Sequence, residues 1–117
     1  MTFSGPIPTL YVTDIPATID FYRDVLGFTC ANQTDAWAAL SRDSAEIILS
    51  LPNAHLPFEK SLFTGSFYFR VSDVDSVWNA LKDKTEIVYP IESFDYGMRE
   101  FAIRDCNNYI LQFGQQL

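Results

Sequence analysis

Few residues in this chain have the type and the spacing that catalysis requires. The only histidine, His55, lies in the loop at 52–57. A lone histidine in a loop is more often a solvent-facing polar group than a catalytic base. Glu46 and Glu100 are the acidic residues nearest the predicted strands, and Glu100 stands beside Arg99, so we expect an ordinary ion pair there.

The cysteines and glycines carry no recognisable motif either. Cys30 falls in a predicted strand and Cys106 in a turn, without the spacing of a metal site or the cysteine density of a secreted disulfide scaffold. The glycines never cluster as they do in phosphate-binding loops, and no Ser-His-Asp or Cys-His combination is visible. These residues therefore predict neither covalent catalysis nor nucleotide binding.

The strand–helix segment that would position a site occurs twice in the sequence. The run Leu10 to Ile15 (LYVTDI) returns as Phe69 to Val74 (FRVSDV) after a shift of 59 positions, 73 minus 14. The same shift aligns two sets of residues with the i, i+3, i+4, i+7 spacing of a helix face. These sets are Ile15, Thr18, Ile19 and Tyr22, and Val74, Val77, Trp78 and Leu81.

Each predicted helix has a strand before it and a cap at its start. The apolar runs at 6–12 and 65–71 predict the strands, and each ends at a pair of residues that can accept from free helix amides. These pairs are Thr13/Asp14 and Ser72/Asp73. The first helix is predicted to stop at Leu26-Gly27, because glycine adopts the left-handed conformation that closes helices.

Three short strands are predicted after each helix, so that each half is β-α-β-β-β. Turns at 42–44 and 104–108 separate the last two strands of each half and align at a shift of 62, 105 minus 43. The predicted strands are Phe28 to Gln33, Ala36 to Ser41 and Glu46 to Leu51, then Glu86 to Tyr89, Met98 to Arg104 and Tyr109 to Phe113.

Composition indicates one α+β domain over residues 1–117. A chain of 117 residues with 48% hydrophobic residues can bury a real core. We expect module one at about 6–52 and module two at about 64–114, linked by the 53–63 loop.

Charge and hydropathy limit the partners. The formal net charge of −7 argues against nucleic acid, which needs clustered Lys and Arg. A cationic ligand would be attracted, but solubility explains the acidity at least as well and is the favoured interpretation. No apolar run approaches the ~20 residues that span a bilayer, and the N-terminus lacks the pattern of a signal peptide, so we expect a cytoplasmic protein without membrane partners.

The two ends of the chain resemble the glyoxalase, bleomycin resistance and extradiol dioxygenase group, also called the vicinal oxygen chelate superfamily. The resemblance rests on the runs at 8–14 (PTLYVTD), 20–28 (DFYRDVLGF), 96–105 (YGMREFAIRD) and 108–113 (NYILQF). The final hairpin is most similar to the bleomycin-resistance-like branch. The resemblance covers nearly the whole chain and agrees with the repeat, but this fold hosts many chemistries.

The resemblance implies that each module curls its sheet into a half-barrel, with the helix outside and the ligand on the concave side. Strand alternation gives independent support for two-faced strands. Phe67, Phe69 and Val71 form one apolar face, whereas Ser66, Tyr68 and Arg70 form a mixed face. By the repeat, Ile7, Thr9 and Tyr11 fall on the same side as the mixed face.

Enzymes of the resembling superfamily generally present His or Glu at four metal-binding places. Here these places hold Ile7, Ser66, Ile48 or Ser50, and Gln112. None is an imidazole or carboxylate ligand, which divalent first-row metals favour. We therefore expect no metal, no cofactor and no catalytic residue at these positions.

The remaining residues expected on the concave side of the sheets suit a flat organic ligand. By resemblance, Trp37 and Tyr96 match positions where the drug-binding branch places aromatic rings against its ligand. Arg70 could clamp a carboxylate, although an exposed strand arginine is more frequent. The predicted ligand-binding residues are Tyr11, Trp37, Tyr68, Tyr96 and Met98 as apolar walls, with Ser50, Ser66, Arg70 and Gln112 as orienting polar groups.

Three functions stay open. The preferred one is a metal-free protein of the bleomycin-resistance-like kind, associated with antibiotic resistance, that sequesters a small aromatic or cationic compound. The second is a lyase, isomerase or dioxygenase with a metal at shifted positions, or acid–base chemistry from Glu100, Tyr11 or His55. The third is a structural or regulatory dimer. Its own side chains would fill the concave side of the sheets, and Ile7 and Ile48 would be core residues.

The aromatic content also predicts an interface. Ten Phe, six Tyr and two Trp are more than one thin sheet hides easily, and leftover apolar surface usually marks a contact. In the resembling family, single-domain members pair as homodimers. We expect a C₂ homodimer.

Overall fold

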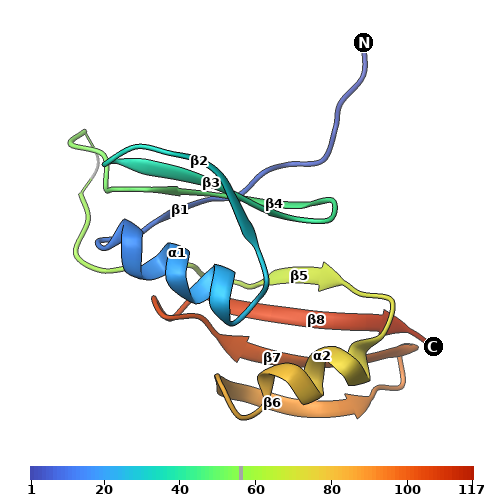
Figure 1. The fold of residues 1–117 in the computed structure, drawn as a ribbon. Coiled ribbons are helices and arrows are strands. Elements are labelled where there is room, and N and C mark those ends of the chain that lie inside the picture. Colours follow the sequence, from blue (N-terminus) through green and yellow to red (C-terminus); the bar gives the residue numbers. More distant parts are fainter. Residues whose placement is uncertain (56) are drawn as a thin grey trace. The chain divides into compact units, whose positions relative to one another are not determined.

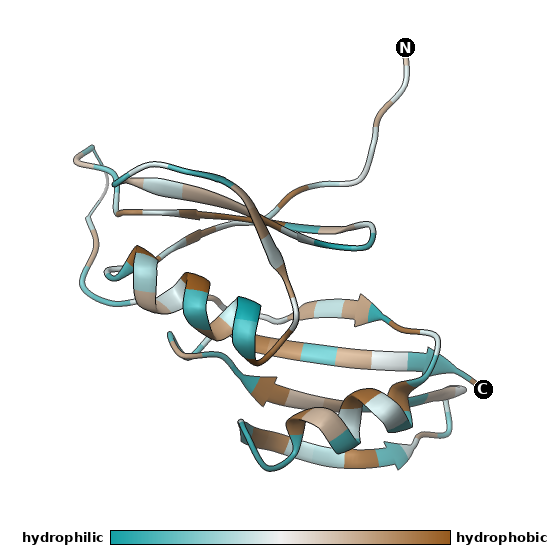
Figure 2. Ribbon diagram, viewed as in Figure 1, coloured by the Kyte–Doolittle hydropathy of each residue, from teal (hydrophilic) through white to brown (hydrophobic). Residues whose placement is uncertain are grey.

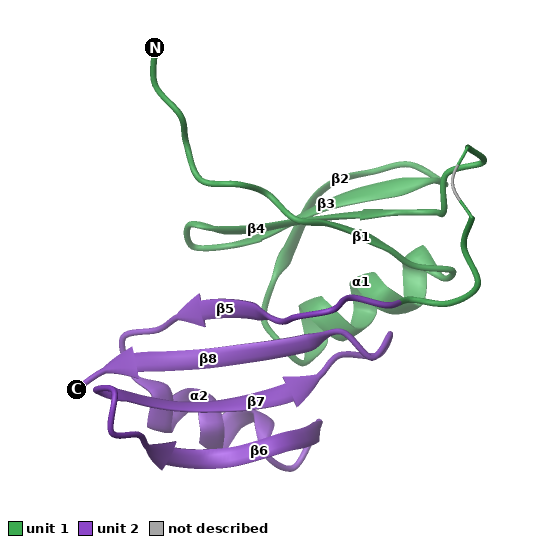
Figure 3. Ribbon diagram, turned by 180° about the vertical axis from the view of Figure 1, so that it is seen from behind, with its two compact units in different colours: residues 1–61 green, residues 62–117 purple. Residues whose placement is uncertain are grey.

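The computed structural model describes residues 1–55 and 57–117. They form two compact units, Met1–Ser61 and Leu62–Leu117 (Figure 3). Each unit combines one helix with one four-stranded sheet (Figure 1). Among the described residues, neither helix is long and apolar enough to cross a membrane.

Unit 1 has a mixed sheet in the order β1-β4-β3-β2. Strand β1 runs parallel to β4, and the other neighbours are antiparallel. The elements are β1 (Thr9–Tyr11), α1 (Ile15–Asp24), β2 (Thr29–Gln33), β3 (Trp37–Arg42) and β4 (Ala45–Ser50).

Unit 2 repeats this arrangement in the order β5-β8-β7-β6, with β5 parallel to β8. Strands β6, β7 and β8 pair antiparallel. The elements are β5 (Phe67–Arg70), α2 (Val74–Leu81), β6 (Glu86–Ser93), β7 (Met98–Arg104) and β8 (Ile110–Gln116). The β-α-β-β-β order predicted for each half is confirmed.

Strand boundaries differ most at β6. We expected a strand over residues 86–89, but β6 continues through Pro90 to Ser93. Its register against β7 shifts twice, between Ile87 and Tyr89 and between Tyr89 and Glu92. Proline has no amide to donate, so strands tolerate it only at edges and irregularities, and β6 is the last strand in its sheet order.

Both predicted N-caps are confirmed. An Asp14 side-chain oxygen accepts from the Ala17 amide at 3.0 Å, and an Asp73 oxygen accepts from the Ser76 amide at 3.2 Å. Helix α1 ends at Asp24, two residues before the predicted stop. Gly27, with φ +72°, then takes the left-handed conformation, and its amide donates to the Arg23 carbonyl.

In each unit the helix covers one face of the sheet (Figure 1). In unit 1, the row Leu10, Leu49 and Ala38 is in register across β1, β4 and β3 and is buried. The predicted α1 face is confirmed, since Ile15, Thr18, Ile19 and Tyr22 are all buried. Figure 2 shows hydrophobic and hydrophilic residues together on α1, as expected for a helix with one buried side.

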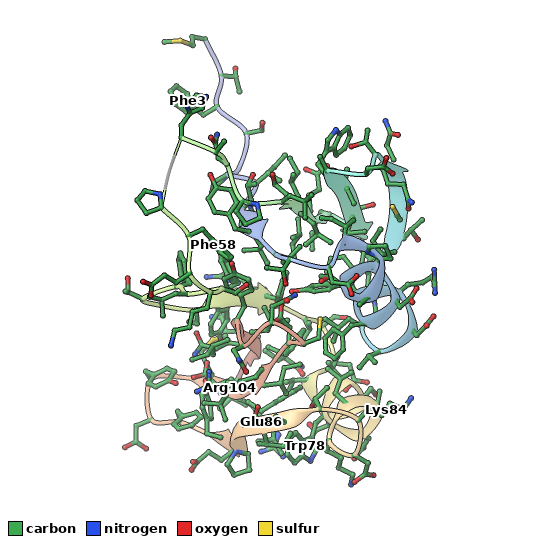
Figure 4. All side chains as sticks on the ribbon, turned by 90° about the vertical axis from the view of Figure 1, so that its left-hand side faces the viewer. Phe3, Phe58, Trp78, Lys84, Glu86 and Arg104 are labelled. Carbon is green, nitrogen blue, oxygen red and sulfur yellow. The ribbon has the colours of Figure 1, made fainter. Side chains whose placement is uncertain are left out.

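In unit 2, a chain of aromatic rings joins the helix to its sheet. Trp78 on α2, labelled in Figure 4, meets Phe101 of β7 edge-on at 5.1 Å between ring centroids. Phe101 stacks with Phe113 at 5.2 Å, and Phe113 with Phe69 at 5.4 Å. These rings define the helix side of the sheet. The opposite side, which we call the helix-free face, carries the alternate residues of each strand.

Candidate functional site

The helix-free face of unit 1 gathers three of the predicted site residues. Tyr11 is in register with Ser50, and Ser50 with Trp37, so these side chains form one row across β1, β4 and β3. All three are half-buried. Tyr11 also meets the ring of Phe58 edge-on at 6.3 Å. The row is therefore partly covered within its own unit.

The helix-free face of unit 2 carries most of the remaining predicted residues. Tyr68 is in register with Gln112, one row away from the row of Arg70, Gly114 and Glu100. The predicted sidedness of β5 is confirmed, because Phe69 stacks on the helix side while Tyr68 and Arg70 lie on the other. In Figure 3 this sheet lies in front of α2.

Glu100 is the centre of a hydrogen-bonded network on this face. Although it belongs to a strand face without a helix, its side chain is buried, at 4% exposure. Tyr68 donates to Oε2 at 2.5 Å, Tyr89 donates to Oε1 at 3.1 Å, and Tyr96 also donates to Oε1. The carboxylate therefore accepts from three phenols, contributed by β5, β6 and the β6–β7 turn.

Gln112 extends the network away from Glu100. Its Nε2 donates to the Tyr89 hydroxyl at 2.8 Å, and its Oε1 accepts from the Ser66 hydroxyl. We call the whole set the Glu100 network. It consists of Ser66, Tyr68, Tyr89, Tyr96, Glu100 and Gln112.

The network keeps Glu100 charged. Burial alone would raise its pKa, but the hydrogen bonds from Tyr68, Tyr96 and Tyr89 together hold the pKa below the ordinary value of 4.5. Hydroxyl donors favour the ionised form because a carboxylate accepts and does not donate. Glu100 is thus an anion at neutral pH and a weak base.

The pKa values of the three tyrosines shift in the opposite direction, upward. Burial and the bond to Glu100 raise the pKa of Tyr68 well above 10, and burial raises the pKa of Tyr89. The hydrogen bond to Glu100, followed by burial, raises the pKa of Tyr96 to about 12. All three therefore remain protonated donors at neutral pH.

Gly114 makes room for the bond between Tyr68 and Glu100. A Cβ at position 114 would lie 1.8 Å from the Tyr68 hydroxyl oxygen and 2.5 Å from its ring carbon Cζ. The Tyr68 side chain crosses β8 directly over this residue, between the strand that carries it and the strand of Glu100. Only glycine leaves this path free.

An aromatic ledge continues the network at the β6–β7 turn. Phe94 and Tyr96 stack at 5.3 Å with an interplanar angle of 7°, and Tyr89 meets Phe94 edge-on at 5.9 Å. Tyr96 is 65% exposed and Tyr68 is 41% exposed. Rings and a buried anion therefore lie side by side in unit 2.

The expected ion pair between Glu100 and Arg99 is wrong. Arg99 points to the helix side and pairs with Asp75 of α2 at 2.9 Å. Neighbouring residues of a strand face opposite ways, and this alternation was the available signal for placing Glu100 on the helix-free face. Sequence reasoning also missed Tyr89, Phe94 and Gly114.

Two predicted residues share the face of the network without joining its hydrogen bonds. Arg70 is exposed and stands in register with Gly114, while Met98 is half-buried and in register with Gln116. His55, considered as a base, lies in the loop after β4, where its amide donates to Asn53. Glu46 is exposed on β4.

The family's metal positions do not fit a divalent ion. The Ser66 hydroxyl is bonded to Gln112, the Ser50 hydroxyl donates to the Leu51 carbonyl at 2.9 Å, and Ile7 and Ile48 have no donor atoms in their side chains. In the chain outside residue 56, no group of three or more His, Cys, Asp or Glu residues could hold a metal ion. These positions therefore offer a divalent ion neither imidazole nor carboxylate.

Comparison with known proteins gives consistent relatives. The family model described as Glyoxalase/Bleomycin resistance protein/Dioxygenase superfamily matches residues 7–113. The bleomycin resistance protein of Geobacillus stearothermophilus is 29% identical over 127 residues, covering 95% of this chain and 96% of that protein. A bleomycin resistance protein of Staphylococcus aureus matches equally well.

Solved structures show the same fold with different functions. The bleomycin-binding protein from bleomycin-producing Streptomyces verticillus, complexed with copper(II)-bleomycin, has a TM-score of 0.74 at 24% identity, covering 97% of this chain and 96% of that one. Lactoylglutathione lyase from Agrobacterium tumefaciens also has a TM-score of 0.74, at 19% identity, covering 98% and 96%. These likenesses confirm the predicted α+β fold.

The resemblance predicted from the chain ends, including its bleomycin-resistance-like character, is thus confirmed by the family model and by the curated relatives. The fold neighbours include both a binding protein and a lyase. The chain belongs to the Glyoxalase/Bleomycin resistance protein/Dioxygenase superfamily.

Proposed function

We propose that this protein is a metal-free binding protein of the bleomycin-resistance-like type, which sequesters a small aromatic or cationic compound without changing it. The observation that carries the proposal is the Glu100 network, a buried anion held by three phenols beside exposed rings. Apolar walls with a few fixed polar groups are typical of small-molecule sites. The curated relatives named for bleomycin resistance support the same function.

The chemistry of Glu100 favours binding over proton transfer. A general base works best when its pKa lies near the working pH, whereas the tyrosine bonds lower the pKa of Glu100. Of the remaining predicted residues, Arg70 and Met98 would extend the binding surface on the helix-free face of unit 2. Tyr11, Trp37 and Ser50 form a separate row on the helix-free face of unit 1, where a ligand role stays a prediction.

A thermal-shift screen of chelator-treated protein tests the proposal. A library of aromatic amines, amidines and drugs, with bleomycin included because relatives carry its name, should contain compounds that raise Tm, since a ligand of the native state stabilises it. Mass spectrometry of the incubated compound should show unchanged mass. A stoichiometric transition metal in the untreated protein, or turnover of a hit, would support the enzyme alternative instead.

A matched pair of variants localises the response. Glu100→Gln should abolish most of the Tm increase, whereas Glu92→Gln should retain it. Glu92 is in register with Glu100 on the neighbouring strand but is exposed, so both variants remove one negative charge from adjacent places. An equal response of both variants would place the ligand elsewhere.

We also infer that the chain is a single domain over residues 1–117 that assembles as a C₂ homodimer. Exposed apolar side chains support an interface, because Phe3 is 87% exposed, Leu62 73% and Phe63 50%. Sedimentation velocity should give a species of twice the chain mass of 13.3 kDa. A monomer at micromolar concentration would contradict the dimer.

A further inference from the structure

Glu100 is a buried anion without a cationic partner. Three arginines lie on the same sheet. Arg99 pairs with Asp75, and Arg104 with Glu86 at 3.9 Å, the latter two labelled in Figure 4. Arg70 is exposed, two strands from Glu100. In the described part of the chain, no ion pair reaches Glu100. Burying a charge is costly. The hydrogen bonds from the three neutral phenols outweigh the effect of burial on the pKa of Glu100, but they bring no positive charge to it.

The protons of the network have one consistent arrangement. An ionised carboxylate only accepts hydrogen bonds. Each of the three tyrosines, Tyr68, Tyr89 and Tyr96, must therefore donate its single hydroxyl hydrogen to Glu100. Tyr89 can then only accept from Gln112, whose amide must present Nε2 to it. The amide oxygen of Gln112 therefore faces Ser66 and accepts the hydrogen bond that the Ser66 hydroxyl donates.

This arrangement leaves lone pairs, and not hydroxyl protons, for a ligand. The carboxylate has about four acceptor sites, of which the phenols use three. The hydroxyl oxygens of Tyr68 and Tyr96 can each accept one more bond. The second amide hydrogen of Gln112 is the one donor that these bonds do not use. Around Glu100, the network therefore favours a ligand group that donates hydrogen bonds.

The adjacent rings add a requirement of shape. The stacked pair Phe94 and Tyr96 presents a flat ledge, and the exposed Tyr96 ring is its outer member. Planar cations stack on aromatic faces and donate in their own plane, which combines the ring contact with the acceptor lone pairs.

We propose that the Glu100 network is a subsite for a planar N–H-bearing cation, an amidinium or guanidinium group on an aromatic ligand. The inference rests on the proposed binding function and narrows its ligand class. The cation donates to the hydroxyl oxygens of Tyr68 and Tyr96, whose side chains are exposed, and the charge of the buried Glu100 behind them attracts it. It supplies the positive charge that the chain itself does not provide there.

Arg70 favours a different ligand class, carboxylates. It lies two strands from Glu100 in the same row of the helix-free face and could instead hold a carboxylate. Three planar probes of nearly equal shape separate the two classes, namely benzamidine (cationic), benzamide (neutral) and benzoate (anionic).

Calorimetric or NMR titration of the full chain with the three probes at neutral pH is the test. We expect benzamidine to bind at least about tenfold more tightly than benzamide, and benzoate to bind most weakly. Equal affinity for benzamidine and benzamide, a preference for benzoate, or no binding of benzamidine would each overturn the inference.

Variants assign the preference to the network. Glu100→Gln should reduce benzamidine affinity about tenfold or more and leave benzamide within about twofold, whereas Glu92→Gln should preserve the ratio. Tyr96→Phe, which removes one acceptor from an exposed ring, is the second variant if Glu100→Gln does not fold, and should lower the ratio at least about threefold. An unchanged ratio in both site variants would overturn the inference.

The outcomes separate this inference from the proposed function. If library compounds bind and raise Tm while benzamidine shows no advantage over benzamide, the cation subsite is wrong and the binding function stands. If chelator-treated protein responds to no compound in the library, the binding function itself fails.

Discussion

Gly114 shows how a single missing side chain supports the site. The three atoms nearest to a hypothetical Cβ at this position all belong to Tyr68. Because the Tyr68 hydroxyl is bonded to Glu100, it cannot yield to the new methyl group without breaking that bond. The requirement for glycine at position 114 therefore comes from Tyr68. Substitutions at the two positions should not have additive effects on stability or on ligand binding.

Gly114→Ala should lower the free energy of unfolding by about 1–3 kcal/mol, the usual cost of a lost bond to a buried charged group. In a Tyr68→Leu background the same change should cost less than about 0.5 kcal/mol, because the clash is gone. Urea unfolding of the four proteins measures the coupling. Gly5→Ala, with no atom within 4 Å, is the control. Equal costs in both backgrounds would contradict the steric role of Gly114.

The Glu100 network should also set a pH window of stability. The pKa of Glu100 is lowered below 4.5 in the folded protein, so its contribution is present above about pH 4.5 and is lost as the pH falls through the lowered value. The raised tyrosine pKa values act at the other end. Above about pH 10 the unfolded chain releases phenolic protons that the folded protein keeps, so stability falls.

Urea midpoints across pH check this window. The difference between the wild type and Glu100→Gln should be constant from about pH 5 to 9 and should shrink in acid, since the variant cannot titrate at this position. Subtraction removes the effect of other carboxylates with lowered pKa values, such as Asp24 and Asp73. A difference that grows as the pH falls below 4 would contradict the direction of the Glu100 shift.

At the residue scale, part of the network was predictable from the sequence. The sequence predicts Ser66, Tyr68, Tyr96 and Gln112 as site residues, and the hydrogen bonds of the network join all four, while their binding role stays a prediction. The sequence predicts a strand that ends at Tyr89 and no role for its side chain, whereas in the structure Tyr89 lies between two register shifts of β6. Simple alternation cannot place residues across such irregularities.

At the element scale, the two helices begin in the same way because Asp14 and Asp73 use the same cap. Asp14→Ala and Asp73→Ala should each cost about 1 kcal/mol of stability, since each leaves a first-turn amide without its acceptor. Asp14→Asn, which keeps an acceptor oxygen, is the control and should cost less. Thermal unfolding monitored by circular dichroism gives the values. Equal losses for Asp14→Ala and Asp14→Asn would point to charge and not to the cap.

The repeat made the elements predictable, whereas their ends were less so. Helix faces and caps follow from side-chain period and from local hydrogen bonds, both of which are written in neighbouring residues. The extension of β6 past Pro90 depends on pairing with β7 across two register shifts, which side-chain period does not predict. The left-handed Gly27 that predicted the stop of α1 is present, and the helix ends at Asp24, within two residues of that prediction.

At the scale of the whole molecule, family membership and fold agree with the sequence, but neither decides the chemistry. The same fold occurs in a bleomycin-binding protein and in a lactoylglutathione lyase. The chemistry of this chain therefore has to be argued from its own side chains. Hydroxyls, an amide and isoleucine side chains occupy the family's metal positions, and the one buried carboxylate of unit 2's helix-free face is bonded to phenols.

Calorimetry of chelator-treated protein with its most stabilising compound from the screen tests the central claim most directly. We predict that affinity before and after chelation agrees within about twofold, and that Glu100→Gln but not Glu92→Gln weakens it about tenfold or more. Binding that disappears on chelation and returns with added metal would contradict a metal-free site built on Glu100.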